Sequence, residues 1–265
     1  MSDAPVTYEA EGGIATLTLT APPANTYSYE MMRALDDAVL RARMDDAVHV
    51  LVLRGAGEKF FCAGADIKML GSVTPRFKYY FCLHANETLA RLEQTPKLVI
   101  AALNGHCVGG GLEVALAADI RLARKGAGKV GLPEVSLGVL PGTGGTQRLL
   151  RLVGKARALD LMASGRLFEF EEAKALGIVG DVIEADGVDA FMAEVRRRAL
   201  EYVPPGRASK AVGLIKRAVH SGGEMALTEG LALERELQQQ LFESEDAREG
   251  IAAHNERRRP SFKGR

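Results

Sequence analysis

The sequence has few cysteines, no net charge and no long apolar run. Its three cysteines, Cys62, Cys82 and Cys107, match no zinc or redox spacing, so we interpret them as small buried hydrophobic residues in a reducing cytoplasm. No apolar run reaches the roughly 18 residues of a membrane helix, and no basic segment precedes an apolar stretch at the N-terminus. We therefore expect a cytoplasmic protein without a membrane segment.

The charge balance also excludes a class of partner. Lysine plus arginine equals aspartate plus glutamate, at 34 each. This balance gives no support for nucleic-acid binding as the main role. The basic run Arg257–Arg259 near the end is the one feature that favours RNA binding, and a solvated tail explains it more simply.

The length and composition are typical of a globular protein. The chain has 265 residues, of which 47% are hydrophobic, so it can form one large domain or one domain with an extension. Expected strands alternate with expected helices, which is the pattern of an α/β fold with largely parallel strands. The strands are expected at 14–20, 48–53, 98–103 and 119–123, and the helices at 28–44, 75–93 and from 109–111 to 118.

The character of the chain changes after Pro141. Three short helices are expected at 144–153, 155–164 and 171–176, followed by a brief strand at 182–183. From Asp189 onward almost everything is predicted to be helical, with breaks at Pro204-Pro205 and Gly222-Gly223. We therefore divide the chain into an α/β core with the active site, 1–200, and a helical oligomerisation region, 201–265. The basic tail from Arg257 is expected to be frayed.

Two glutamates in apolar, glycine-rich sequence are the first candidates for chemistry. Glu113 follows Gly109-Gly110-Gly111 and is flanked by apolar residues, and Glu134 follows Pro133. Carboxylates are costly to bury unless they are paired, hydrogen-bonded or protonated, so two of them here suggest a pair for proton transfer. Each also has a simpler interpretation, because Glu113 could be a solvated first-turn glutamate and Glu134 an exposed loop residue.

Backbone donors are expected beside these carboxyls. The glycines at 109–111 lie between a buried strand and a helix, where free N–H groups form an anion site, although they could simply permit tight packing. Gly110 and Glu113 are three residues apart and share one helix face. Small residues at 63–65 precede Asp66, which is a plausible helix cap. Lys68 is either a solvated lysine or a phosphate contact.

Motifs of other enzyme classes are either absent or lack the secondary structure that they require. Gly126 to Gly131 has G-x-G-x-x-G spacing, but Pro133 follows and no amphipathic helix opens there. The sequence has no phosphate-binding G-x-x-x-x-G-K-[ST], no H-E-x-x-H zinc motif and no G-x-S-x-G nucleophile motif. We expect no metal site.

Three segments together resemble the enoyl-CoA hydratase, or crotonase, family. They are Phe61-Cys62-Ala63-Gly64-Ala65-Asp66-Ile67-Lys68, Asn104-Gly105-His106-Cys107-Val108-Gly109-Gly110-Gly111-Leu112-Glu113, and the segment from Gly131 to Leu149. The resemblance runs from about Val6 to Lys263. It implies a crotonase-like spiral of repeated ββα units followed by a helical oligomerisation region that forms trimers or dimers of trimers.

The resemblance also implies roles for individual residues. The N–H groups of Ala65 and Gly110 would form an oxyanion hole for the thioester carbonyl, and Glu113 and Glu134 would hold one water for acid–base catalysis. The remaining residues that it places against the substrate or its coenzyme A part are Ala63, Asp66, Ile67, Lys68, Gly109, Pro133, Gly142 and, from a neighbouring subunit, Arg257. No cofactor is implied, because coenzyme A is part of the substrate.

The fold does not choose among the reactions of this family. Two glutamates favour hydration of a trans-2-enoyl-CoA to a 3-hydroxyacyl-CoA, in fatty-acid or related acyl-CoA breakdown. An isomerase that shifts the double bond with Glu134 alone, or another acyl-CoA-processing enzyme such as a hydrolase, remains an alternative. The sequence does not name the acyl group.

Overall fold

A twisted parallel sheet forms the centre of the molecule. The computed structural model describes residues 4–265. Six strands follow one another across the sheet, and all neighbours are parallel except the first pair. In spatial order they are β1 (Val6–Glu11), β2 (Ile14–Leu19), β3 (Val50–Gly55), β5 (Leu98–Leu103), β7 (Ile120–Arg124) and β10 (Asp181–Ile183). The expectation of largely parallel strands is confirmed.

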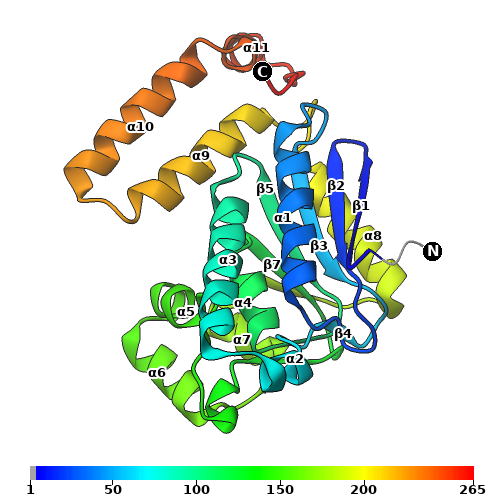
Figure 1. The fold of residues 1–265 in the computed structure, drawn as a ribbon. Coiled ribbons are helices and arrows are strands. Elements are labelled where there is room, and N and C mark those ends of the chain that lie inside the picture. The colour runs from blue at the N-terminus through cyan, green and yellow to red at the C-terminus, as the bar shows by residue number, and fades with distance from the viewer. Residues whose placement is uncertain (1–3) are drawn as a thin grey trace.

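Helices cover both faces of this sheet (Figure 1). On one face, side chains such as Leu17, Leu51 and Ala101 pack with α1 (Tyr29–Met44), α3 (Pro75–Gln94) and α4 (Gly110–Leu116). On the other face, Val50, Val52 and Ile100 pack with α8 (Gly187–Leu200). Because successive strand residues point to opposite faces, the apolar runs noted in the sequence fill both layers.

A second, smaller sheet lies beside the first and carries the functional segments. Its strands follow the order β4 (Phe60–Cys62), β6 (His106–Val108), β8 (Lys129–Gly131) and β9 (Phe168–Glu169). The chain contributes one strand to the large sheet and the next to the small sheet, and a helix follows: β3, β4 and α2 (Ile67–Ser72), and then β5, β6 and α4. This succession is the expected spiral of ββα units. Sequence periodicity missed these strands, because each has only two or three residues.

Three further helices lie between the small-sheet strands β8 and β9. They are the 3-10 helix η1 (Glu134–Leu137), α5 (Gly145–Val153) and α6 (Lys155–Ser164), and α7 (Phe170–Ala175) follows β9. Ser28, Thr74 and Asp66 cap α1, α3 and α2 by accepting backbone N–H groups, as their positions before the helices suggest. The predicted boundaries of α1, α3, α5 and α6 agree with the structure to within one residue.

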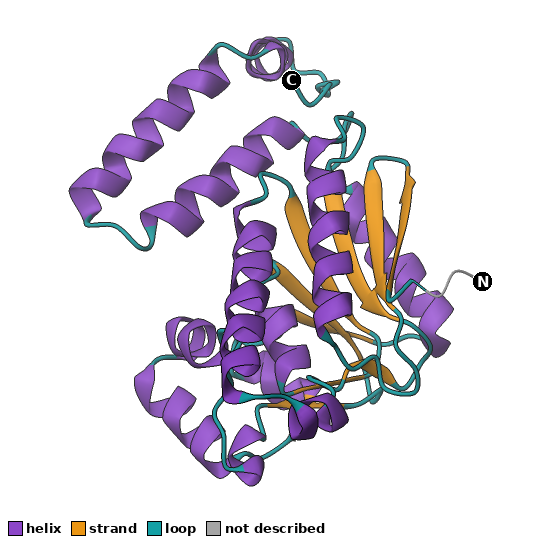
Figure 2. Ribbon diagram, in the orientation of Figure 1, coloured by secondary structure: helices purple, strands orange, loops and turns teal. Residues whose placement is uncertain are grey.

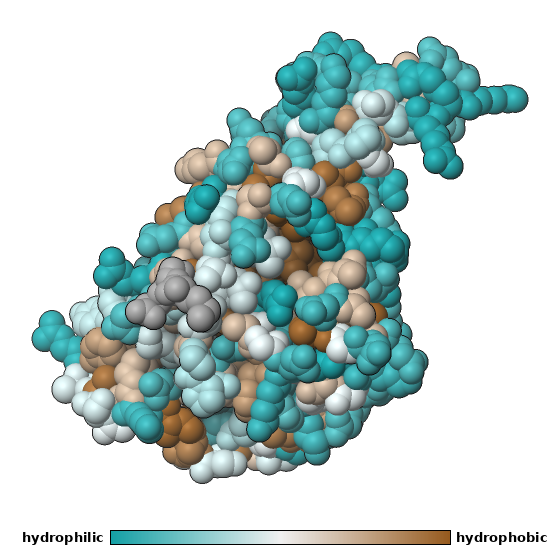
Figure 3. All heavy atoms as spheres, turned by 90° about the vertical axis from the view of Figure 1, so that its right-hand side faces the viewer, coloured by the Kyte–Doolittle hydropathy of each residue, from teal (hydrophilic) through white to brown (hydrophobic). Residues whose placement is uncertain are grey.

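The C-terminal helices project from one end of the sheet (Figures 1 and 2). They are α9 (Ser209–Gly222), α10 (Leu227–Phe242) and α11 (Glu245–Asn255). On the face shown in Figure 3, the upper end of the molecule is mainly hydrophilic, whereas apolar residues gather on the body. No helix in residues 4–265 is both long and apolar enough to cross a membrane. The division at residue 200 stays a prediction.

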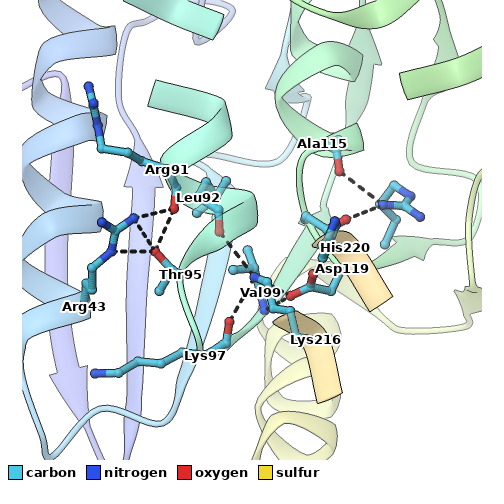
Figure 4. A network of polar contacts seen from close by, with 12 residues as sticks. Arg43, Arg91, Leu92, Thr95, Lys97, Val99, Ala115, Asp119, Lys216 and His220 are labelled. Carbon is cyan, nitrogen blue, oxygen red and sulfur yellow. Dashed lines mark hydrogen bonds and ion pairs between the residues drawn. The ribbon is translucent and has the colours of Figure 1, made fainter. Parts of the chain in front are cut away.

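A buried ion pair fixes α9 to the core (Figure 4). The Lys216 ammonium lies 2.8 Å from the Asp119 carboxylate, and both side chains are almost fully buried. Asp119 also accepts the Val99 N–H at 2.7 Å and contacts His220 at 3.0 Å. Close packing supports this link, because a β carbon at Gly213 would lie 2.1 Å from the Pro96 carbonyl oxygen. The sequence alone did not indicate this connection.

The expectation of a frayed C-terminal tail is wrong. Asp246 accepts the backbone N–H groups of Lys263 and Gly264 at 2.7 and 2.8 Å, and the Phe262 N–H donates to the Pro205 carbonyl at 3.2 Å. Arg258 pairs with Glu249 at 2.6 Å. These bonds hold the tail against α11 and the loop before α9, so its basic residues are partly used inside the molecule.

Candidate active site

The three functional segments begin where three neighbouring strands end. β4, β6 and β8 are parallel neighbours in the small sheet, so their carboxyl ends lie along one edge. Segment 63–68 follows β4, segment 109–113 follows β6 and segment 132–134 follows β8. The carboxyl edge of parallel strands is where open α/β sheets gather binding residues. The local fold therefore brings together segments that are up to 71 positions apart in sequence.

Glu113 is buried and fully hydrogen-bonded. Its side chain points from the first turn of α4, and the residue is 2% exposed. One carboxylate oxygen accepts the N–H groups of Thr143 and Gly145 at 2.8 and 2.7 Å, and the other contacts the Thr143 hydroxyl. An ionised carboxylate only accepts hydrogen bonds, so three donors suit that form. The alternative of a solvated first-turn glutamate is wrong.

Glu134 has a different environment at the start of η1. One of its oxygens lies 3.0 Å from the position that a β carbon on Gly109 would occupy, and the other is buried without a hydrogen-bond partner in residues 4–265. The pKa of Glu134 is raised from 4.5 to about 7, mainly by burial. The charge of Glu113 contributes to this rise, whereas a hydrogen bond with the backbone of Glu134 itself and the charge of Lys78 oppose it. One carboxyl is thus tightly bound by donors, whereas the other can carry a proton near neutral pH.

Two free backbone donors lie beside these carboxyls. Tyr27 forms an isolated parallel bridge with Ala65, in which the bonds run from Tyr27 N–H to Gly64 O and from Asp66 N–H to Tyr27 O. This pattern leaves the Ala65 N–H without an acceptor in residues 4–265, and the same holds for the Gly110 N–H, which begins α4. They can serve an incoming oxyanion.

The loops carrying these donors lie against each other. A β carbon at Gly64 would lie 3.0 Å from Gly110 N, and the φ angle of Gly64 is +88°. The close approach and the left-handed backbone both require glycine there. Two donors on adjoining loops have the geometry that charge stabilisation on a carbonyl oxygen requires.

A tyrosine and a threonine support Glu113. The Tyr27 hydroxyl lies 3.1 Å from the Thr143 hydroxyl, which in turn contacts Glu113. Burial raises the pKa of Tyr27 well above 10, so it remains a neutral hydroxyl. Sequence reasoning gave neither residue a role. The glycines around Thr143 were a usable signal, because Gly145 also donates to Glu113, but no sequence feature indicated Tyr27.

The other predicted site residues lie at several positions around this centre. Asp66 caps α2 through the Lys68 and Met69 N–H groups at 2.8 and 3.4 Å, which is its structural interpretation. Ala63 is half-buried in the same segment, whereas Ile67 and Lys68 are exposed. Gly109 lies at the Glu134 carboxyl and Pro133 precedes η1.

Gly142 connects the site to α3. It is half-buried, and a β carbon there would lie 3.3 Å from the Cys82 sulfur. Cys82 itself is half-buried, in contrast to the fully buried Cys62 and Cys107, and all three thiols are free. The expectation of buried cysteines therefore holds for two of the three.

Arg257 does not join the site within one chain. It is exposed and follows α11, at the end of the molecule opposite α2 (Figure 1). Any contact with a substrate at the carboxyl edge of the small sheet would have to come from the Arg257 of another copy.

Comparisons with known proteins agree in fold and family. The family model for enoyl-CoA hydratase/isomerase matches residues 9–265. A putative enoyl-CoA hydratase/isomerase of Bacillus subtilis is 38% identical over 252 residues, with 95% of each chain covered. A short-chain-enoyl-CoA hydratase of Clostridium acetobutylicum is 36% identical over 262 residues, with 98% of each covered. The structure of an enoyl-CoA hydratase from Geobacillus kaustophilus is 43% identical with a TM-score of 0.95, covering 100% of this chain and 98% of that one.

Proposed function

This chain belongs to the enoyl-CoA hydratase/isomerase family, and from that premise we propose that it is an enoyl-CoA hydratase. It adds water across the double bond of a trans-2-enoyl-CoA thioester and gives a 3-hydroxyacyl-CoA. The observation that carries the proposal is that a fully hydrogen-bonded Glu113 and a Glu134 with a buried, unpartnered oxygen lie next to two free N–H groups.

The backbone donors act on the thioester. The Ala65 and Gly110 N–H groups bind its carbonyl oxygen, on which negative charge grows when C2 becomes enolate-like. Donors fixed in this way stabilise the charge without reorganising during the reaction, and removing one typically costs about 3 kcal/mol.

The carboxyls divide the proton transfers between them. Glu113 takes a proton from the water, whose hydroxyl oxygen bonds to C3, and protonated Glu134 gives its proton to C2. The sum is one H and one OH added across the double bond. Return of a proton from Glu113 to Glu134 restores the starting state. The different environments of the two carboxyls support these opposite roles.

The proposal includes no metal or redox cofactor, and coenzyme A enters as part of the substrate. It also includes a homo-oligomer, a trimer or a dimer of trimers, in which the C-terminal helices of one chain meet a neighbour. Arg257 of that neighbour would then contact the coenzyme A part, together with Lys68 on the exposed start of α2.

One observation favours an isomerase as the second candidate. Both oxygens of Glu113 already accept hydrogen bonds from the protein, whereas one oxygen of Glu134 is free. A single carboxyl with a pKa of about 7 can carry a proton between C4 and C2 and so shift a double bond.

Spectroscopy of crotonyl-CoA tests the hydratase. We expect the purified protein to remove the conjugated enoyl-thioester ultraviolet band and to form a product heavier by one water. Glu113→Gln and Glu134→Gln should each lower kcat by roughly a hundred- to ten-thousandfold. Unchanged rates in both variants would exclude the two-carboxylate mechanism. Full activity of Glu113→Ala on a 3-enoyl-CoA, without hydration of crotonyl-CoA, would establish the isomerase instead.

A further inference from the structure

We propose that Lys78 forms an anion subsite beside Glu134, which selects enoyl-CoA esters whose acyl group carries a distal carboxylate. The inference rests on the proposed hydratase function, because it names the substrate class of the same site.

Lys78 is not placed where a lysine stabilises its own helix. It lies in the first turns of α3, which begins at Pro75, and no acidic residue is present in the first turn. The N-terminus of a helix carries a partial positive charge, so a cation there is unfavourable for helix stability. The positive potential of this helix end suits an anion that the chain itself does not supply.

Lys78 also lacks a partner of its own. It is half-buried, yet it forms no ion pair and no side-chain hydrogen bond within residues 4–265. Other partly buried cations of this region are paired: Arg91 of α3 binds Asp36 at 2.5 Å, and Arg148 binds Glu93 of α3 at 2.6 Å. A partly desolvated ammonium whose charge no carboxylate of the described residues neutralises is costly, so an anionic ligand is favoured.

Aromatic contacts direct Lys78 toward the catalytic carboxyls. Its ammonium lies 5.2 Å from the Phe81 ring centroid, and that ring lies 5.7 Å from the Tyr27 ring. Tyr27 reaches Glu113 through Thr143. The Lys78 ammonium is therefore connected to the Glu113 carboxylate through the side chains of Phe81, Tyr27 and Thr143.

The spacing of residues along α3 also indicates that Lys78 lies on the face of the helix that is turned toward the site. Cys82 is four residues after Lys78 and therefore lies on the same face of α3. Its sulfur would contact a β carbon at Gly142, so this face of the helix meets the loop that binds Glu113.

The charge of Lys78 acts on Glu134, at the acyl end of the site. It counteracts the burial that raises the pKa of Glu134, the carboxyl that gives its proton to C2. A substrate carboxylate beyond C3 would be repelled by ionised Glu113 unless a cation compensated, and Lys78 is close enough for its charge to lower the pKa of Glu134. The proposed function already assigns the coenzyme A part to Lys68 and to Arg257 of a neighbouring chain. The structure therefore favours a carboxylate on the acyl chain over a phosphate as the ligand of Lys78.

Two five-carbon substrates that differ only in charge test the proposal. They are glutaconyl-CoA, which ends in a carboxylate, and trans-pent-2-enoyl-CoA, which ends in a methyl group. We expect kcat/KM to be at least about tenfold higher for glutaconyl-CoA. Lys78→Met should remove this preference through KM, with less than about a threefold change for pent-2-enoyl-CoA, and Lys78→Arg should retain it. Arg76→Met, which removes an exposed cation from the same turn, is the matched control and should retain the preference.

Other results would overturn the subsite. Equal losses on both substrates in Lys78→Met would mean that the lysine acts on Glu134 or on coenzyme A. A wild-type preference for pent-2-enoyl-CoA would reject the subsite and leave the hydratase proposal intact.

Calorimetry separates the two proposals if neither ester is hydrated. Glutaryl-CoA and pentanoyl-CoA are the saturated counterparts of the two substrates, so their binding can be compared without turnover. Tighter binding of glutaryl-CoA that Lys78→Met abolishes would support the subsite after the hydratase proposal had failed, and equal binding would reject the subsite as well.

Discussion

The unpartnered oxygen of Glu134 makes this residue unfavourable for stability at neutral pH. Its pKa rises from 4.5 to about 7 on folding because the carboxyl is buried. Between these two values the folded chain binds more protons than the unfolded chain, so stability falls as the pH rises from 4.5 to 7 and then stays constant. Sites that store such a cost commonly trade stability for activity.

Glu134→Gln should therefore stabilise the fold although it slows hydration. At pH 8 we expect a gain of about 1–2 kcal/mol in the free energy of unfolding, after allowing for partial solvent exposure, and almost no gain at pH 4.5. Urea unfolding at the two pH values measures it. Glu87→Gln, at an exposed position on α3, is the control. A variant no more stable than the wild type at pH 8 would contradict the burial of this carboxyl.

The same pKa predicts the pH dependence of catalysis. Hydration requires protonated Glu134, so kcat/KM should fall tenfold per pH unit above about 7. The measurement is kcat/KM for crotonyl-CoA between pH 6 and 9, because this ratio reports the free enzyme. A constant ratio across that range would exclude Glu134 as the acid.

The Tyr27 hydroxyl should act as a positioning group. Tyr27→Phe removes one hydrogen bond to Thr143, worth about 1 kcal/mol, and loosens the threonine that contacts Glu113. We expect kcat to fall about five- to tenfold, while KM changes little. Tyr8→Phe removes a buried hydroxyl that has no partner in the described chain, and kcat should not change in it. Equal effects in the two variants would disprove the positioning role.

Sequence reasoning at this scale found the charged residues and missed their supports. Glu113 and Glu134 were visible because carboxylates are unusual in apolar, glycine-rich sequence. Tyr27 lies 86 positions before Glu113 and looks like any aromatic residue near a helix start. Its role depends on which hydroxyl it meets after folding, and one sequence does not contain that information.

At the scale of elements, α9 depends on one buried ion pair. Lys216 reaches Asp119 and the carbonyl oxygens of Leu92 and Lys97, so this side chain connects α9 with the turn before β5 (Figure 4). Removing one partner of a buried pair leaves an uncompensated charge.

Lys216→Met should destabilise the protein strongly. We expect a loss of about 3 kcal/mol, the lower end for buried pairs, because Asp119 keeps its contacts with Val99 and His220. Urea unfolding measures the loss, and Lys210→Met, at an exposed position of the same helix, should cost less than about 0.5 kcal/mol. Similar values for the two variants would mean that the pair does not hold α9.

The elements themselves were predictable in proportion to their length. Helices of nine residues or more carry a full apolar stripe, and the boundaries of α1, α3, α5 and α6 followed from their caps and glycines. β4, β6 and β8 carry too few residues for any period. They are nevertheless the elements that align the functional segments, so the arrangement of the site could not be derived from periodicity.

At the scale of the whole molecule, the projecting helices expose large apolar side chains. Val219 is 68% exposed on α9, Leu227 is 78% exposed on α10, and Phe242 at the end of α10 is 65% exposed. Large exposed apolar side chains on a projecting element favour contact with another copy. The sequence predicted a helical region, but not which of its faces stays uncovered, because that depends on how α9 docks.

Replacing Leu227 and Phe242 together by serine should weaken the oligomer. We expect trimers or larger assemblies for the wild type and mainly monomers for the double variant, measured by size-exclusion chromatography with light scattering. Gln238→Ser, on the same helix, should leave the assembly unchanged. A monomeric wild type would contradict the proposed oligomer.

The three thiols differ in reactivity, so one of them can be labelled selectively with a fluorophore. Burial raises the pKa of Cys62 to about 12 and that of Cys107 well above 9, so both are poor nucleophiles toward alkylating dyes. Cys82 is half-buried, and its sulfur faces the Gly142 loop. A maleimide fluorophore would therefore attach at Cys82, beside the loop that binds Glu113, and occupancy by a thioester could be followed as protection from labelling.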